Sequence, residues 1–178
     1  RTTAIMTSNE AGTGPDDIRL PSGGSITLTT GNAVTVDTND DFTMEGTSSI
    51  TMSPAADGAT AVLVNAGVTS TVTIGDIDGP WATGTGRYGV RYAAGAPVTG
   101  NLIVTSVGSI SVDGNNSYGI SIESGLIGRL QSQGNIRVFG DNSIAISTQG
   151  PITGDIMLLG SVSARGLNAS AISIGGDV

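Results

Sequence analysis

The sequence predicts an all-β fold, a right-handed parallel β-helix whose coils of about 26 residues each contain three short strands. Three observations lead to this prediction: a β-type composition, a repeat of fixed period, and alternation of apolar and polar residues within each repeat. The chain of 178 residues contains 28 glycines, 12% charged residues and 3% aromatic residues. Thr, Val and Ile are abundant, and these residues fit a pleated strand better than a helix.

The repeat is clearest in the second half of the chain. Asn116 begins the segment NSYGISI, Asn142 begins NSIAIST and Asn168 begins NASAISI, so the three copies share one spacing of 26 residues. A fixed period of this length is typical of a solenoid. We expect the three asparagines to stack in one column, with successive Cα atoms about 4.8 Å apart.

Earlier units are weaker copies of the same repeat. Residues 88–92 (YGVRY) are offset by 30 residues from the next unit, because residues 93–107 carry an insertion. The segments that begin at Ala61 and Ala33 continue the series. We therefore expect β-helix repeats over residues 17–178, continuing beyond the chain end in the parent protein, and an irregular or capping segment at residues 1–16.

Alternation within each unit predicts which side chains are buried. Ile120 and Ile122 are expected to face the interior and Gly119 and Ser121 the solvent, because strand side chains alternate with period 2. The same pattern predicts a buried row of Ile120, Ile146 and Ile172, continued by Val90 and Val62, and an exposed row of Ser121, Ser147 and Ser173. A unit of this length holds about three strands of 4–6 residues with Gly, Asn and Asp turns.

Other architectures fit the sequence less well. No unit shows the apolar stripe of a helix at positions i, i+3 and i+4. Leucine-rich repeats need a leucine consensus that these units lack. A β-sandwich would suit the composition, but nothing in a sandwich requires a 26-residue period.

Charge and composition also exclude several classes of function. The net charge is −8 and the seven basic residues are scattered, which argues against nucleic acid as a partner. The chain has neither His nor Cys, so it lacks the commonest general base and metal ligand, and it can form no disulfide. No apolar run reaches the roughly 20 residues of a membrane-spanning helix.

Three pairs of carboxylates are candidates for a catalytic or calcium site. Asp16 and Asp17, Asp40 and Asp41, and Asp76 and Asp78 could form the pairs that glycoside hydrolysis requires, or could bind calcium. Asp also favours turns, and the insertions that could wall a cleft are short: residues 38–41, 76–86 and 93–99. We therefore expect turn residues here, and no catalytic, cofactor-binding or metal site. Whether calcium binds the Asp-rich turns is left open by the sequence.

Aromatic residues offer a second candidate site. Trp81 and Tyr88, beside Tyr92 and Tyr118, could form a patch on which a sugar ring stacks, but we expect Trp81 to cover apolar surface within its own insertion instead. The asparagine column is expected to be structural, because stacked side-chain amides hydrogen-bond along the axis.

Three motifs resemble the N-terminal part of autotransporter passenger domains, the type V secreted proteins of Gram-negative bacteria. They are residues 78–91 (DGPWATGTGRYGVR), residues 114–124 (GNNSYGISIES) and Gly-x-Ile strands such as residues 108–110. The resemblance covers nearly the whole chain. It implies a β-helical passenger that follows a cleaved signal peptide and precedes a C-terminal outer-membrane barrel. No barrel lies within these residues.

The expected function is that of a surface-exposed or secreted structural or adhesive β-helix without enzymatic activity, assembling into an extended filament or surface layer. Its expected partners are further passenger repeats, other copies of the chain stacked on the β-helix ends, and cell-surface glycans or proteins. The alternative is a β-helix that binds or degrades polysaccharides. Such a protein would place two carboxylates, or an arginine with carboxylates, on one outer sheet face within a groove.

Overall fold

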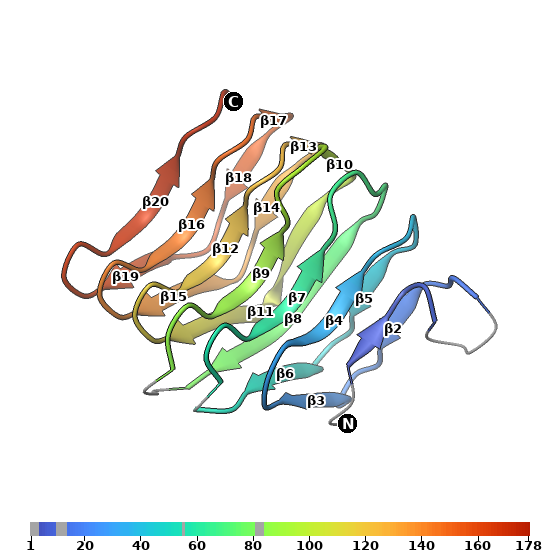
Figure 1. The fold of residues 1–178 in the computed structure, drawn as a ribbon, viewed down its shortest axis with the longest axis horizontal. Coiled ribbons are helices and arrows are strands. Elements are labelled where there is room, and N and C mark those ends of the chain that lie inside the picture. The colour runs from blue at the N-terminus through green and yellow to red at the C-terminus, as the bar shows by residue number, and fades with distance from the viewer. Residues whose placement is uncertain (1–3, 10–13, 55, 81–83) are drawn as a thin grey trace.

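The computed structural model of the chain describes residues 4–9, 14–54, 56–80 and 84–178. These residues form an all-β parallel solenoid of about six turns, with coils of about 27 residues and three parallel sheets. Successive coils stack along one axis from the N-terminal to the C-terminal end (Figure 1). The predicted fold class is confirmed. No helix long and apolar enough to cross a bilayer occurs among these residues.

The first sheet receives one strand from each coil. Its order is β1-β4-β7-β9-β12-β16-β20. The strands are β1 (Ile5–Met6), β4 (Asn32–Val36), β7 (Thr60–Val64), β9 (Tyr88–Tyr92), β12 (Tyr118–Ile122), β16 (Ile144–Thr148) and β20 (Ser170–Ile174).

The second sheet is the largest, with ten strands, and the third has three. The second contains β2 (Ile18–Leu20), β3 (Ser25–Leu28), β5 (Phe42–Met44), β6 (Ser49–Met52), β8 (Val72–Gly79), β11 (Leu102–Asp113), β14 (Leu130–Ser132), β15 (Asn135–Phe139), β18 (Ile156–Leu158) and β19 (Val162–Arg165). The third contains β10 (Val98–Thr99), β13 (Leu126–Ile127) and β17 (Ile152–Thr153).

Strand register reproduces the sequence repeat. Tyr118 pairs with Ile144, and Ile144 pairs with Ser170, so each step in the second half of the chain is one 26-residue unit. Asn116, Asn142 and Asn168 share the left-handed backbone conformation, with φ of 54°, 56° and 56°, which Asn tolerates better than most residues. The amide of Asn168 donates to Oδ1 of Asn142 at 3.2 Å. This bond is the axial amide contact expected of a stacked column.

The predicted interior row is confirmed in the middle of the solenoid and wrong at its last coil. Val62, Val90, Ile120 and Ile146 are buried. Ile172 occupies the same column, but 42% of its surface is exposed. Its strand, β20, is the last of its sheet, so no further coil covers it.

The predicted outward faces require two corrections. Gly119 does not face solvent: a Cβ at this position would lie 2.7 Å from the core side chain of Ile136. Its counterpart Ala145 is fully buried, and the strand pairing skips both residues. The pleat is therefore broken, so that a small residue and the following large one, such as Ile120, both face the interior.

The second correction concerns the serines that follow. Ser121 and Ser147 were predicted to be exposed but are only 1% and 5% exposed. Ser121 pairs with the much larger Arg91 in the coil below, and its hydroxyl lies 3.4 Å from the carboxylate of Glu123. Small outward side chains are shielded by larger neighbours, so outward orientation does not produce exposure here. Ser173, on the last coil, is exposed as predicted.

The two ends of the solenoid differ. At the N-terminal end, Asp37 accepts hydrogen bonds from the hydroxyl of Thr7 and from the backbone N–H and hydroxyl of Ser8. The inward-facing residues Ile5 and Ile26 near this end are buried, whereas the outward-facing Met6 is exposed. At the C-terminal end, Ile172 and Ile174 are exposed, and Ile156 and Leu158 are only partly buried.

Candidate functional site

The outer face of the second sheet carries polar side chains in columns. Ile77, Ile110 and Ile136 are buried, so the residues on either side of them in β8, β11 and β15 face outward. One outward column contains Asp76, Ser109 and Asn135, and a second contains Asp78, Ser111 and Arg137. This face therefore changes from acidic on β8 to hydroxyl-rich on β11 and basic on β15.

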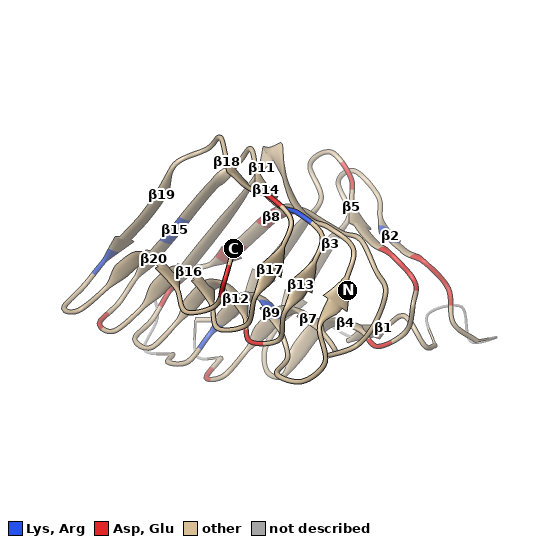
Figure 2. Cartoon of the chain, turned by 90° about the horizontal axis from the view of Figure 1, so that it is seen from above, with Lys and Arg blue, Asp and Glu red and all other residues tan. Residues whose placement is uncertain are grey.

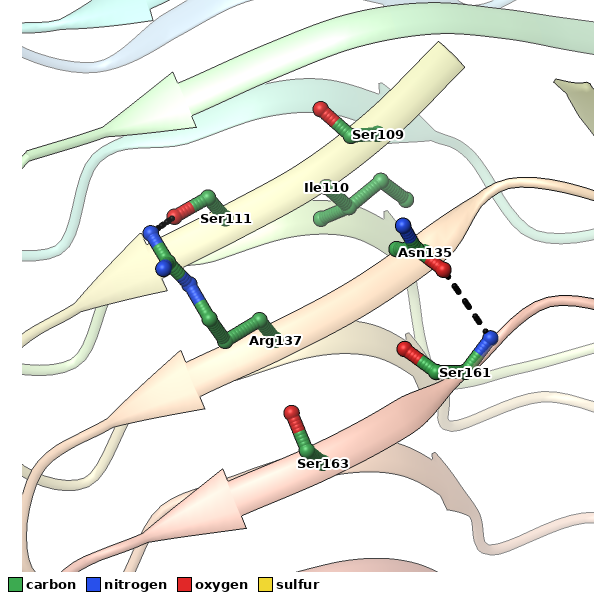
Figure 3. Close-up of a pocket in the computed structure, with 7 residues that line it drawn as sticks. All are labelled: Ser109, Ile110, Ser111, Asn135, Arg137, Ser161 and Ser163. Carbon is green, nitrogen blue, oxygen red and sulfur yellow. Dashed lines mark hydrogen bonds between the residues drawn. The ribbon is translucent and has the colours of Figure 1, made fainter. Parts of the chain in front are cut away.

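A hollow of about 350 Å³ opens on this face, over β11, β15 and β19. The side chains around it come from three successive coils (Figure 3). Two hydrogen bonds order them: Arg137 donates to the hydroxyl of Ser111 at 2.8 Å, and Oδ1 of Asn135 accepts the N–H of Ser161 at 3.0 Å. The lining residues are Ser109, Ile110, Ser111, Asn135, Arg137, Ser161 and Ser163.

Two arginines converge on an aromatic ring beside this hollow. The guanidinium carbon of Arg137 lies 4.8 Å from the centroid of the Phe139 ring, and that of Arg165 lies 5.7 Å from it. No carboxylate in the described part of the chain forms an ion pair with either arginine. Figure 2 shows basic segments on β15 and β19, whereas acidic segments gather near β2 and β5.

Asp113 is the buried carboxyl of this region. One of its oxygens, Oδ1, is buried without a hydrogen-bond partner. Burial raises the pKa of Asp113, and the neighbouring charge of Arg137 opposes that increase. The residue pairs in register with Phe139, one coil away.

The carboxylates singled out in the sequence have structural partners. Oδ1 of Asp17 accepts the N–H of Asp41, and Oδ1 of Asp41 accepts the N–H of Thr71, so each fastens a turn to the next coil. Oδ1 of Asp16 accepts the N–H of Asp17, and Asp40 accepts the hydroxyl of Thr38. All four lie in connections between strands, as the turn interpretation predicts. Among the residues that the structure covers, no cluster of three or more Asp or Glu could hold a metal ion.

The turn interpretation is wrong for Asp76 and Asp78, because both lie within strand β8 and the strand pairing continues to Gly79. Oδ1 of Asp76 accepts the hydroxyl of Ser109 at 3.0 Å, and Asp78 is exposed. Both share the outer face with Arg137, which is the combination expected of the polysaccharide alternative. Neither carboxylate lines the hollow.

The structure brings together two of the four aromatic residues of the predicted patch, Tyr88 and Tyr118, and places Tyr92 in the core. Tyr88 and Tyr118 stack face to face on the first sheet, with ring centroids 5.0 Å apart, and Arg91 lies over the Tyr88 ring. Arg91 also forms a bidentate ion pair with Glu123, at 2.7 and 2.9 Å. Tyr92 is in the core, where burial raises the pKa of its hydroxyl. Trp81 lies outside the described residues.

Arg87 is a buried charged residue that the sequence pattern did not single out. Arg87 is fully buried, and its guanidinium donates to the backbone carbonyls of Met52, Ser53, Gly79, Pro80 and Asp113. Burial lowers its pKa, opposed by the charges of Asp113, Asp78 and Asp57. The sequence feature that could have pointed to a structural role for Arg87 is its position directly after the insertion at residues 76–86. Arg87 thus ties together the strand ends of neighbouring coils.

Comparisons with known proteins do not assign this chain to a protein family. No family model matches the chain, and searches of curated proteins and of solved structures find no significant match. The fold itself defines the class: a parallel β-solenoid of about six turns.

Proposed function

We propose that this chain is a non-enzymatic structural or adhesive β-solenoid, displayed on the cell surface or secreted as part of an autotransporter-like protein of a Gram-negative bacterium. The motif resemblance in residues 78–91 and 114–124 supports this class. The use of Asp and Asn side chains supports the structural role. Asp57, Asn115 and Asp141 each accept a backbone N–H from the next coil, as Asp17 and Asp41 do.

The observation that carries the proposal is the open C-terminal face. Ile146 is 1% exposed, whereas Ile172, its counterpart one coil later, is 42% exposed. An apolar cross-section with a free sheet edge recruits further strands. The proposed occupant is a second copy of this chain stacked end to end, as in a filament or surface layer.

Surface display in a Gram-negative host tests this function. The chain would be placed between a signal peptide and an outer-membrane barrel, and its exposure on intact cells measured with antibody and protease. We expect a displayed domain that resists protease. The matched control is Ile146→Asp, which should be displayed in a protease-sensitive form because its core is disrupted. Retention of the unaltered chain in the periplasm, or equal sensitivity of both chains, would contradict the proposal.

The second candidate is a polysaccharide-binding or polysaccharide-degrading β-helix. The observation that favours it is the placement of Asp76, Asp78 and Arg137 on one outer face. Cleavage would release new reducing ends from acidic or neutral polysaccharides. If these ends appear, and their release is lost in Asp76→Asn or Asp78→Asn, the chain is an enzyme and the structural proposal is wrong on that point.

A further inference from the structure

We propose that the hollow over β11, β15 and β19 binds a carboxylated saccharide, with Arg137 holding the carboxylate and the serine and asparagine side chains bonding the sugar hydroxyls. This binding site goes beyond the proposed scaffold role and does not depend on it. The inference rests on the shape of the hollow, its hydrogen-bonding groups and the unpaired charge beside it.

The hollow has the size and floor of a small-ligand site. Its volume of about 350 Å³ falls within the range of about 300–1,000 Å³ that is usual for such sites. The side chain of Ile110 points into the core and is fully buried, so the backbone of β11 at this residue forms the floor of the hollow. The remaining lining residues are polar, so the hollow presents a strand floor surrounded by hydrogen-bonding groups.

Those groups match the mixed donor and acceptor character of sugar hydroxyls. Because Oδ1 of Asn135 accepts the Ser161 N–H, the amide group is oriented and its NH₂ can donate to a ligand. Ser109 donates to Asp76, which leaves its oxygen able to accept. Ser163 on β19 and Ser161, directly before this strand, are both exposed (Figure 3).

Arg137 supplies the charge that selects a carboxylate. Only one of its five N–H groups is used in the described structure, toward Ser111, and the Phe139 ring holds the guanidinium from one side. Arg165 adds a second cation at the same ring. A planar guanidinium without an ion-pair partner can bind a carboxylate through two parallel hydrogen bonds.

The acidic side of the face sets the orientation of the ligand. Asp76 and Asp78 lie on β8, one coil before the serines of β11, and Asp113 is also on that side of Arg137. These carboxyl groups repel an anion, whereas Arg137 and Arg165 attract it. The ligand carboxylate is therefore directed toward β15 and β19, with the sugar hydroxyls over the serines.

The test compares a hexuronate tetrasaccharide with its methyl ester, which has the same sugar backbone without the charge. Binding to the full chain would be measured by calorimetry and by NMR shifts of the hollow residues. We expect the acid to bind, and the ester to bind about tenfold more weakly or worse, because a charge-assisted hydrogen-bond pair is lost. The shifts should concentrate on Ser109, Asn135 and Ser163.

Three variants localise the binding. Arg137→Gln should weaken binding of the acid by about tenfold or more. Ser163→Tyr should block the hollow without changing the charge. Arg19→Gln is the matched control, because Arg19 is an exposed arginine on β2 of the same sheet, and it should leave the affinity unchanged. Circular dichroism would verify that each variant is folded.

The proposal would be overturned by absence of binding, by equal affinity for acid and ester, or by unchanged affinity in the folded Arg137→Gln variant. Titration with sodium sulfate separates a saccharide site from a simple anion site. Sulfate binding at Arg137 without saccharide binding would also overturn the proposal. Failure here leaves the display experiment unaffected, so the two proposals are tested separately.

Discussion

An interior coil and the last coil share one sequence pattern and have different burial. In β16, Ile146 and Thr148 are 1% and 2% exposed; in β20, their partners Ile172 and Ile174 are 42% and 51% exposed. Both strands follow an asparagine in the same left-handed conformation. In a solenoid each repeat contacts only its neighbours, so burial is determined by the adjacent coil rather than by the local sequence.

The N-terminal end shows that an end need not be open. There Thr7 and Ser8 bond to Asp37, and the core residues Ile5 and Ile26 are covered. Among the described residues, inward-facing isoleucines are covered at the N-terminal end and exposed at the C-terminal end.

The largest expected effect separates the two coils directly. Ile146→Asp should lower the free energy of unfolding by about 4 kcal/mol or more, because a carboxylate would be buried without a partner. Ile172→Asp should cost less than about 1 kcal/mol, since solvent reaches this position. Urea unfolding of the two variants measures both losses in the free energy of unfolding. Equal losses would mean that the last coil is covered in solution and that the comparison is wrong.

A smaller difference is expected for the serines beside them. Ser147 faces outward but is 5% exposed, so Ser147→Asp should destabilise by about 1 kcal/mol while the new carboxylate turns toward solvent. Ser173→Asp should have no measurable effect on the melting temperature. A loss at position 147 as large as that of Ile146→Asp would show that this serine belongs to the core.

The smallest expected effects concern pH. Burial raises the pKa of Asp113, so its contribution to stability is lost as the pH rises through that raised pKa, above about 3.9. Asp113→Asn should therefore gain stability relative to the unaltered chain as the pH increases toward neutral. Denaturant midpoints at several pH values measure this difference.

Asp37 is expected to affect the pH dependence of stability in the opposite direction to Asp113. Burial tends to raise its pKa, but hydrogen bonds from Ser8 and Thr7 outweigh burial and lower it. The stability it contributes is present above about pH 3.9 and lost as the pH falls through the lowered pKa. Asp37→Asn should therefore cost stability at neutral pH and less at acid pH. The same sign for both variants would contradict these assignments.

The fold was predictable because the repeat constrains it strongly. The spacing of Asn116, Asn142 and Asn168 and the Ile120 and Ile146 row required stacked parallel strands. Strict alternation failed at Gly119 and Ala145, because the pleat breaks there and both a small and a large residue turn inward. A period-2 pattern contains no information about such a break.

The candidate site was much less predictable. Arg137 and Asn135 are ordinary outward residues in the sequence, and only the register brings them beside Ser109 and Ser163 from neighbouring coils. The buried role of Arg87 depends on carbonyls from three separate strand ends, which no local pattern indicates. Long-range juxtaposition, rather than local propensity, builds both features.

The open C-terminal face can be tested most directly by adding one coil. The N–H of Ile152 donates to Asp177 at 2.8 Å, so Val178 follows in register with Ile152, and a copy of residues 153–178 placed after Val178 would continue the stack. Hydrogen exchange of the β20 amides would be compared with and without this copy. We expect protection to rise by about tenfold or more, toward that of β16, because local opening of the last coil is suppressed. Unchanged exchange in β20, with the added residues unfolded, would contradict the claim that this face accepts further coils.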